Sequence, residues 1–199
     1  MIELIVGDDG MPRCSWGDGP EMYRRYHDDE WGMPVDDDRV LFEKLCLEGF
    51  QAGLSWLTIL KRREGFRDVF YGFDIDRVAD MGETDVARLL QDTRVIRHRG
   101  KIESTINNAR RAQDVIAALG SLGALVWSYE PDGERSILEA ATAESTALSK
   151  DLKKRGFSFV GPTTSYAFMQ AMGIVNDHLP ACHAWEAVDR ARAEFMRPS

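Results

Sequence analysis

The chain has 199 residues, of which 44% are hydrophobic, so it can bury the core of one domain and is not expected to be disordered. No apolar run reaches the roughly 18 residues of a membrane span, and Met1–Gly10 lacks the basic start and long apolar core of a signal peptide, so we expect a cytoplasmic protein. The formal net charge of −8 excludes a uniformly basic nucleic-acid-binding surface. The first 48 residues carry that whole excess, with 13 acidic and 5 basic side chains, so basic clusters elsewhere can still bind phosphate.

Apolar residues at helical spacing dominate the chain and predict an all-α or nearly all-α fold. In chain order, we expect helices from about 38 to 49 or 53, 55 to 63, 84 to 91, 101 to 119, 145 to 154 and 163 to 173. Residues 157–160 are expected to be extended. Trp185, Val188 and Phe195 indicate that the C-terminal tail packs as a further helix.

The segment that precedes the expected helix at 101–119 is basic, with no acidic residue between Thr93 and Ile102. Val95 and Ile96 can anchor this turn in the core, Gly100 allows close backbone approach, and the next helix offers free N–H groups to a phosphate. These are the features of a helix-hairpin-helix element that binds a DNA backbone. A plain turn between two helices fits the same residues, and the sequence leaves both interpretations open.

Cysteine and histidine residues gather near the two ends of the chain. Twelve residues separate Cys14 from His27, and three separate His178 from Cys182. An odd number of cysteines without a signal peptide argues against a disulfide framework. Two thiolates and two imidazoles can instead form a closed, structural zinc site that would tie the two ends together.

Other interpretations of these residues stay open. The same spacing fits two buried cysteines and two surface histidines, and His183 competes as a ligand beside Cys182. Cys46 lies in an apolar run and is expected in the core. No HExxH pattern supports a hydrolytic zinc site, which would keep an open coordination position.

Aromatic residues crowd the first third of the chain, and one carboxylate lies among them. The rings belong to Trp16, Tyr23, Tyr26, Trp31, Phe42, Phe50 and Trp56. Glu48 lies in an apolar stretch, where an acid has to be paired, protonated or used. Rings and a carboxylate suit a flipped, cationic base, because the rings attract the cation and the carboxylate accepts from its exocyclic amino group. Alternatively, Glu48 is an exposed helix residue and the rings are mostly core.

Six segments carry a resemblance to a known family. They are RCSW at 13–16, YHDDEWG at 26–32, CLEGFQAGLSW at 46–56, IRHRGKI at 96–102, LSK through to glycine at 148–161, and SYAFMQ to NDH at 165–178. In this order they resemble bacterial DNA-3-methyladenine glycosylase I, a family of the helix-hairpin-helix glycosylase superfamily. The resemblance implies one glycosylase domain over residues 12–183, with the hairpin at about 84–118, an extension over 1–11 and a tail over 184–199.

The resemblance also implies a set of site residues. The fold would be a helix-hairpin-helix DNA glycosylase fold whose terminal segments are tied by one structural Zn²⁺, with the ligands Cys14, His27, His178 and Cys182. The base pocket would consist of Glu48 as the catalytic residue and of the rings of Trp16, Tyr23, Tyr26, Trp31 and Trp56. DNA would be contacted by Leu54, which could fill the gap of a flipped nucleotide, and by Arg97, Arg99, Gly100 and Lys101. Pro162 departs from relatives that often have Thr.

The implied activity is hydrolysis of the N-glycosidic bond of 3-methyladenine in alkylated double-stranded DNA, with free 3-methyladenine and an abasic site as products. Most of the superfamily carries a catalytic Asp after the hairpin, but residues 117–122 contain no acid. We therefore expect a monofunctional, monomeric enzyme without an organic cofactor, which relies on the weak bond of a cationic nucleotide. A non-catalytic, zinc-containing reader of alkylated DNA is the main alternative, and a zinc hydrolase of small molecules is disfavoured.

Overall fold

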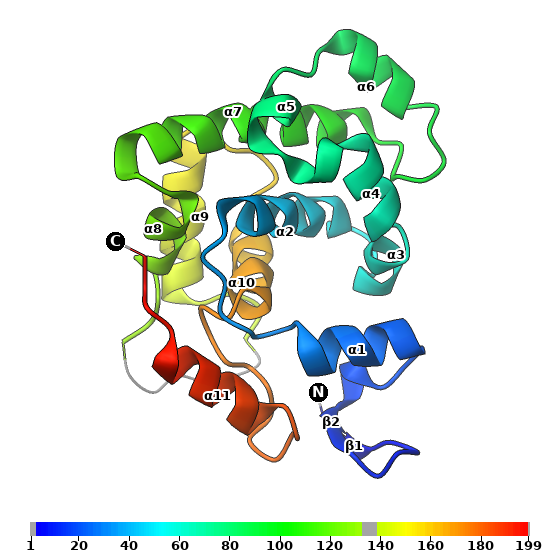
Figure 1. Cartoon of the computed structure of the whole chain (residues 1–199), viewed down its shortest axis with the longest axis vertical. Coiled ribbons are helices and arrows are strands. Elements are labelled where there is room, and N and C mark those ends of the chain that lie inside the picture. The colour runs from blue at the N-terminus through cyan, green and yellow to red at the C-terminus, as the bar shows by residue number, and fades with distance from the viewer. Residues whose placement is uncertain (1–2, 133–138, 199) are drawn as a thin grey trace.

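The structure, a computed structural model, describes residues 3–132 and 139–198. These residues form helices and a two-stranded sheet, so the expectation of a nearly all-α fold is confirmed (Figure 1). The elements are β1 (Leu4–Val6), β2 (Pro12–Cys14), η1 (Ser15–Gly17), α1 (Glu21–Asp29), α2 (Asp38–Gln51), α3 (Trp56–Leu60), α4 (Arg63–Val69), η2 (Tyr71–Phe73), α5 (Ile75–Ala79), α6 (Glu83–Leu89), α7 (Arg99–Leu119), α8 (Leu122–Trp127), α9 (Ala143–Lys154), α10 (Pro162–Ala171) and α11 (Trp185–Glu194).

Helix α2 forms the centre of the molecule, with α7, α8 and α10 packed against it (Figure 1). Asp37 caps its first turn by accepting a hydrogen bond from the backbone N–H of Val40. From Leu41 to Phe50 nearly every side chain is buried, so α2 lacks the polar face of a surface helix. Two ionisable residues, Lys44 and Glu48, are therefore buried in the middle of the core.

The helix expected over 55–63 is in fact two helices. Ser55 caps α3 by accepting from the N–H of Thr58, and α3 ends at Leu60. Helix α4 then begins at Arg63 and contains Gly65, which the sequence placed after a helix. A Cβ atom at Gly65 would lie 2.8 Å from the carbonyl oxygen of Arg94. The glycine is needed because α4 packs directly against the turn that precedes α7.

The other expected helices are confirmed with shifted ends. His98 caps α7 through its Nδ1 atom, which accepts from the N–H of Lys101 at 3.3 Å, so this helix begins at Arg99. Thr142 caps α9. Pro162 begins α10, where its fixed φ and missing N–H cost nothing. The tail forms α11, which buries Val188.

Strands β1 and β2 and helix α11 lie at the same end of the molecule, whereas the last residues run on towards α8 (Figure 1). Strands β1 and β2 pair antiparallel, and the N–H of His183 donates to the carbonyl of Pro12 at 2.9 Å. Residues of the C-terminal segment thereby reach the segment that leads into α1. Among the described residues, no helix has the length and apolar character to cross a membrane.

Candidate active site and metal centre

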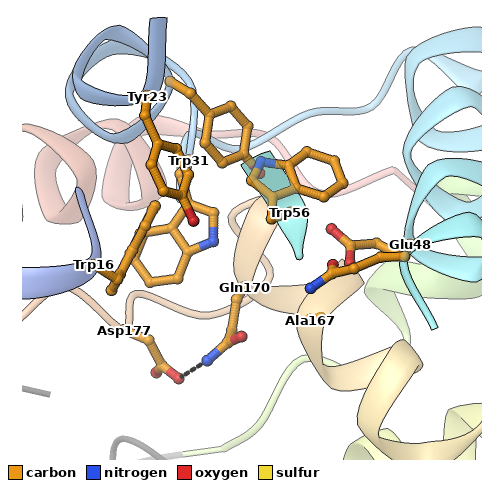
Figure 2. Close-up of a pocket in the computed structure, with 10 residues that line it drawn as sticks. Trp16, Tyr23, Trp31, Glu48, Trp56, Ala167, Gln170 and Asp177 are labelled. Carbon is orange, nitrogen blue, oxygen red and sulfur yellow. Dashed lines mark hydrogen bonds between the residues drawn. The ribbon is translucent and has the colours of Figure 1, made fainter. Parts of the chain in front are cut away.

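A cavity of ≈ 210 Å³ opens between α2, α3, α10 and the N-terminal segment. It is several times larger than the roughly 30 Å³ occupied by one water molecule in the liquid. Its lining residues are Trp16, Tyr23, Tyr26, Trp31, Glu48, Gln51, Trp56, Ala167, Gln170 and Asp177. The structure thus brings together all five rings and the carboxylate that the sequence singled out, and Figure 2 shows Glu48 opposite Trp16 and Tyr23 across the cavity.

The aromatic wall is held rigid by ring contacts. Trp16 packs edge-on against Trp31 with ring centroids 4.8 Å apart, and against Tyr23 at 5.6 Å. Tyr26 continues this wall, with its ring centroid 6.3 Å from Trp16 and 5.2 Å from Trp56. Rings fixed in this way offer their faces to a planar ligand without a further loss of side-chain freedom.

Glu48 supplies the negative group of the cavity. Its side chain is 5% exposed, and it accepts no hydrogen bond from the residues that the structure describes. Burial raises the pKa of Glu48 to about 7, and the nearby charge of Lys44 opposes that rise. A buried acceptor without a donor is unfavourable unless a ligand supplies one. Glu48 is therefore suited to bind a ligand that carries N–H groups or positive charge.

Lys44 lies one helical turn before Glu48 and contacts the same rings. Its ammonium donates to the hydroxyl of Tyr26 at 3.0 Å and lies 4.5 Å and 4.6 Å from the ring centroids of Tyr26 and Trp56. Glu30 lies 3.3 Å away and is itself paired with Arg63 at 2.7 Å. Burial lowers the pKa of Lys44, and the negative charge of Glu30 opposes that effect. The lysine therefore fixes two rings and brings positive charge near Glu48.

Sequence reasoning missed the polar residues at the far side of the cavity. Gln170 and Asp177 both line it, and the Gln170 amide donates to Asp177 Oδ2 at 2.7 Å (Figure 2). Tyr166 donates to the same oxygen at 2.6 Å. These contacts orient the Gln170 amide. Asp177 precedes the expected zinc ligand His178, and that proximity was the signal available in the sequence.

Cys14, His27, His178 and Cys182 form a buried cluster in which one ligand atom of each lies within 4.8 Å of all the others. The Cys182 sulfur is 3.6 Å from His27 Nε2 and 3.6 Å from His178 Nδ1. A tetrahedral ion with bonds of about 2.3 Å to sulfur and about 2.0 Å to nitrogen separates such atoms by roughly 3.5 Å. The cluster is therefore compatible with one metal ion, and it links the N- and C-terminal parts of the chain.

The second nitrogen of each histidine is held by another group. His27 Nδ1 lies 2.7 Å from Asp28 Oδ1, and His178 Nε2 lies 2.9 Å from the carbonyl of Trp31. Such outer contacts fix the tautomer and the orientation of a metal-binding ring. They leave His27 Nε2 and His178 Nδ1 facing the two sulfurs.

His183, the competing ligand, lies outside this cluster of four. Its Nε2 contacts Asp28 Oδ1 at 2.9 Å, so it shares that carboxylate with His27. The segment that contains Gly17 packs directly against the His27 ring, and only glycine fits there, because a Cβ at Gly17 would lie 2.4 Å from that ring. Cys46 is buried in the core, as expected.

The cluster and the cavity share a wall. The Trp31 ring packs edge-on against His178 with centroids 4.7 Å apart, and Trp16 packs against His27 at 5.0 Å. Both tryptophans face the cavity as well. The rings on which a ligand would stack are thus supported directly by His27 and His178 of the cluster.

The basic turn joins helices α6 and α7, so the predicted hairpin consists of these two helices and the turn between them. Val95 is buried and Ile96 packs against the core, so the turn is anchored from within. Arg97 is exposed and forms no ion pair with the described residues. Arg99 is exposed but paired with Glu83 and Glu103.

Leu54 and Lys101, the other two predicted DNA-contacting side chains, lie in different environments. Leu54 is 42% exposed at the tip of the turn between α2 and α3, next to Gly53 with a φ of +79°. Lys101 is buried, and its ammonium donates to the carbonyls of Phe50 and Ala52 at 2.8 Å and 2.6 Å. A phosphate contact by this side chain would require both bonds to break. Gly100 is half-buried next to His98 and Phe159.

Known proteins match this chain in sequence and structure. The family model described as methyladenine glycosylase matches residues 16–185. DNA-3-methyladenine glycosylase 1 of Escherichia coli is 49% identical over 179 residues, which cover 86% of this chain and 96% of that protein. The corresponding glycosylase of Haemophilus influenzae is 45% identical over 85% of this chain and 96% of its own length.

Solved structures agree with these matches. A 3-methyladenine DNA glycosylase I from Staphylococcus aureus, whose structure addresses recognition of 3-methyladenine, has a TM-score of 0.81 and 38% identity, covering 87% of this chain and 96% of that chain. A variant of 3-methyladenine DNA glycosylase I in complex with 3-methyladenine has a TM-score of 0.83 and 37% identity, covering 87% and 97%. On the combined evidence of sequence, fold and cavity, this chain belongs to the DNA-3-methyladenine glycosylase I family.

Proposed function

We propose that this chain excises 3-methyladenine from alkylated double-stranded DNA as a monofunctional glycosylase that leaves an abasic site. The observation that carries the proposal is the carboxylate of Glu48, which is buried among aromatic rings and has no hydrogen-bond donor among the described residues. A 3-methyladenine nucleotide offers both a positive charge and an exocyclic amino group to such an acceptor. The relatives named for this activity support the same conclusion.

Selectivity for the damaged base follows from charge. Stacking rings attract a cationic base through their negative faces, and Glu48 adds an opposite charge in a water-poor cavity. A neutral adenine would gain neither interaction in full. The cationic base would also lower the pKa of Glu48 from about 7 and keep the carboxylate ionised.

Bond cleavage needs little further chemistry from the protein. The leaving group departs as a neutral base from a cationic nucleotide, so no general acid is required. Trp16, Tyr26 and Trp56 would hold the base, and Glu48 would bind it and stabilise the positive charge that develops on the sugar. Water attacks the sugar, and no covalent intermediate with the protein is involved.

DNA would be held by the hairpin and opened by the turn between α2 and α3. Arg97 and Arg99 are exposed beside the backbone of Gly100, where a phosphate can approach the start of α7. Leu54 would enter the duplex in place of the flipped nucleotide, because it is an exposed apolar side chain beside the cavity mouth. Lys101 would belong to this DNA-binding region through the turn that it holds.

We further propose that the cluster of four ligands holds one structural Zn²⁺. Two thiolates and two imidazoles fill all four positions of a tetrahedral ion, so none is left for substrate. Such an ion supplies bonds that hold the fold, and no step of the reaction passes through it. The hydrogen bond between the two thiols lowers the pKa of Cys182 and raises that of Cys14, so a bound ion would have to displace the proton that Cys14 holds.

Residues 12–183 would make up the glycosylase unit, and we expect it to act as a monomer in the cytoplasm. The cavity, the hairpin and the four metal-binding residues all lie within that range. The tail would support it from outside, since Arg192 donates to the carbonyls of Gly173 and Ile174.

The test measures release of methylated purines from alkylated duplex DNA by the wild type, Glu48→Gln and Glu43→Gln. Glu43 is the matched control, because it lies on the same helix but pairs with Arg67 outside the cavity. We expect the wild type and Glu43→Gln to release 3-methyladenine but not 7-methylguanine, and Glu48→Gln to be impaired. A wild type that binds such DNA and releases no base would contradict the proposal and favour a damage reader.

A further inference from the structure

The turn that carries Leu54 is held by hydrogen bonds from Lys101, a residue of the hairpin. Within the turn, the N–H of Leu54 donates to the carbonyl of Gln51 at 2.6 Å, and Gly53 takes a positive φ. The carbonyls just before it, of Phe50 and Ala52, receive the ammonium of Lys101 from the first turn of α7. These carbonyls end helix α2, where backbone acceptors lack partners within the helix.

The contact of Lys101 with these carbonyls joins two parts of the chain that are far apart in sequence, the start of α7 and the end of α2. Lys101 is only 7% exposed, and roughly fifty residues of sequence separate it from its acceptors. A cation at the C-terminal end of a helix also interacts favourably with the helix dipole. Residues further along α7 anchor a second loop, since Ser104 and Asn108 both donate to the carbonyl of Ser158. The first turns of α7 therefore hold the surface next to the cavity.

We infer that Lys101 is a positioning residue that couples the hairpin to the Leu54 turn, so that DNA held by the hairpin meets Leu54 at a fixed distance. This inference rests on the proposed function. It replaces a phosphate contact as the role of the Lys101 side chain, because both acceptors would have to be given up before the ammonium could reach solvent. The base cavity itself does not include Lys101.

The two roles predict different measurements. A phosphate contact contributes to the salt dependence of binding to any DNA. Its removal makes the plot of log K against log salt less steep by about 0.9. A positioning residue leaves that slope unchanged and lowers the rate of excision. It also leaves binding of free 3-methyladenine unchanged, because that ligand needs only the cavity.

The experiment compares Lys101→Met with Arg97→Met in the metal-loaded protein. Methionine keeps most of the lysine stem without its donors, and Arg97 is an exposed residue that we expect to contact phosphate. For Lys101→Met we expect the wild-type salt slope on undamaged duplex, wild-type affinity for free 3-methyladenine, and excision slower by about tenfold to a hundredfold. Arg97→Met should lower the slope. Lys101→Arg, which can still donate to both carbonyls, should recover excision.

A double-mutant cycle with Leu54→Ala gives a second, independent readout. If Lys101 acts through the turn, Lys101→Met should slow excision much less when Leu54 has already been removed. The inference would be overturned if the losses of excision rate in the double-mutant cycle were fully additive. It would also be overturned if Lys101→Met made the salt dependence less steep, left excision unchanged, or weakened binding of free 3-methyladenine as much as it slowed excision. Salt slope and base extrusion, followed with a fluorescent base analogue beside the lesion, remain measurable even if no base is released. Failure of the proposed function is thereby distinguishable from failure of this one.

Discussion

Replacing Glu48 by Gln should stabilise the protein in neutral and alkaline solution while it impairs excision. Burial raises the pKa of Glu48 from the ordinary 4.5 to about 7, so the folded state holds the proton more tightly than the unfolded state does. Below pH 4.5 Glu48 is protonated in both states, and the free energy of unfolding carries no penalty from its ionisation. As the pH rises from 4.5 to 7 the unfolded state releases this proton first, so the free energy of unfolding falls, and above pH 7 the folded state bears the full cost of the buried carboxylate.

The size of the effect follows from that pKa. A difference of this size corresponds to about 3 kcal/mol at pH 8 and about 1 kcal/mol at pH 5. Glutamine has no charge to desolvate, so the free energy of unfolding of Glu48→Gln should exceed that of the wild type by an amount that grows by about 2 kcal/mol between the two pH values. Comparing the two proteins at the same pH cancels the contributions of the other titrating groups, including Cys14, His27, His178 and Cys182.

Urea denaturation followed by circular dichroism at pH 5 and pH 8 measures this difference for both proteins. Equal m-values are needed, since they show that both variants unfold from equally compact states. A stability difference that is the same at both pH values would refute the claim that burial raises the pKa of Glu48. A difference that shrinks with rising pH would mean that Glu48 is paired more strongly than its surroundings indicate.

Three further outcomes are expected. Lys44→Met removes the positive charge that lowers the pKa of Glu48, so the pH of half-maximal 3-methyladenine binding should rise; an unchanged midpoint in a calorimetric titration series would contradict this. Asp28→Asn weakens the contact that orients the His27 ring, so zinc affinity, measured in competition with a chelator, should fall by about tenfold to a hundredfold. An unchanged affinity would show that Asp28 does not orient His27 for the metal. Leu54→Ala should slow excision from duplex DNA but not change binding of the free base, and equal losses in both assays would show that Leu54 supports the cavity instead.

Much of the fold was predictable because its signals are local. Helical periodicity located α2, α7, α9 and α10, but α9 and α10 were expected to start slightly too late, because the cap at Thr142 and the helix start at Pro162 were not recognised. The break between α3 and α4 was missed because its cause is not local. Gly65 is required by the close approach of Arg94, which comes about thirty residues later in the chain.

The candidate site divides in the same way. Glu48 and the five rings have residue types that suit a cavity, but they also fit an exposed acid and core rings, and only the structure brings them together. Lys101 has a residue type that suits phosphate binding equally well, and only its carbonyl partners reveal another role. Gln170 was missed because an amide in a helix carries no chemical signal until its partner Asp177 is placed beside it.

The shared wall between the metal cluster and the cavity has a consequence for biosynthesis. Trp16 comes from the beginning of the chain and rests on His27, whereas Cys182 lies near the end. A nascent chain on the ribosome can bury α2 and the helices around it, but it cannot complete the aromatic wall before Cys182 has been added. A chain that stops before Cys182 should therefore be inert towards bases in DNA, because its aromatic wall lacks the support of the complete cluster.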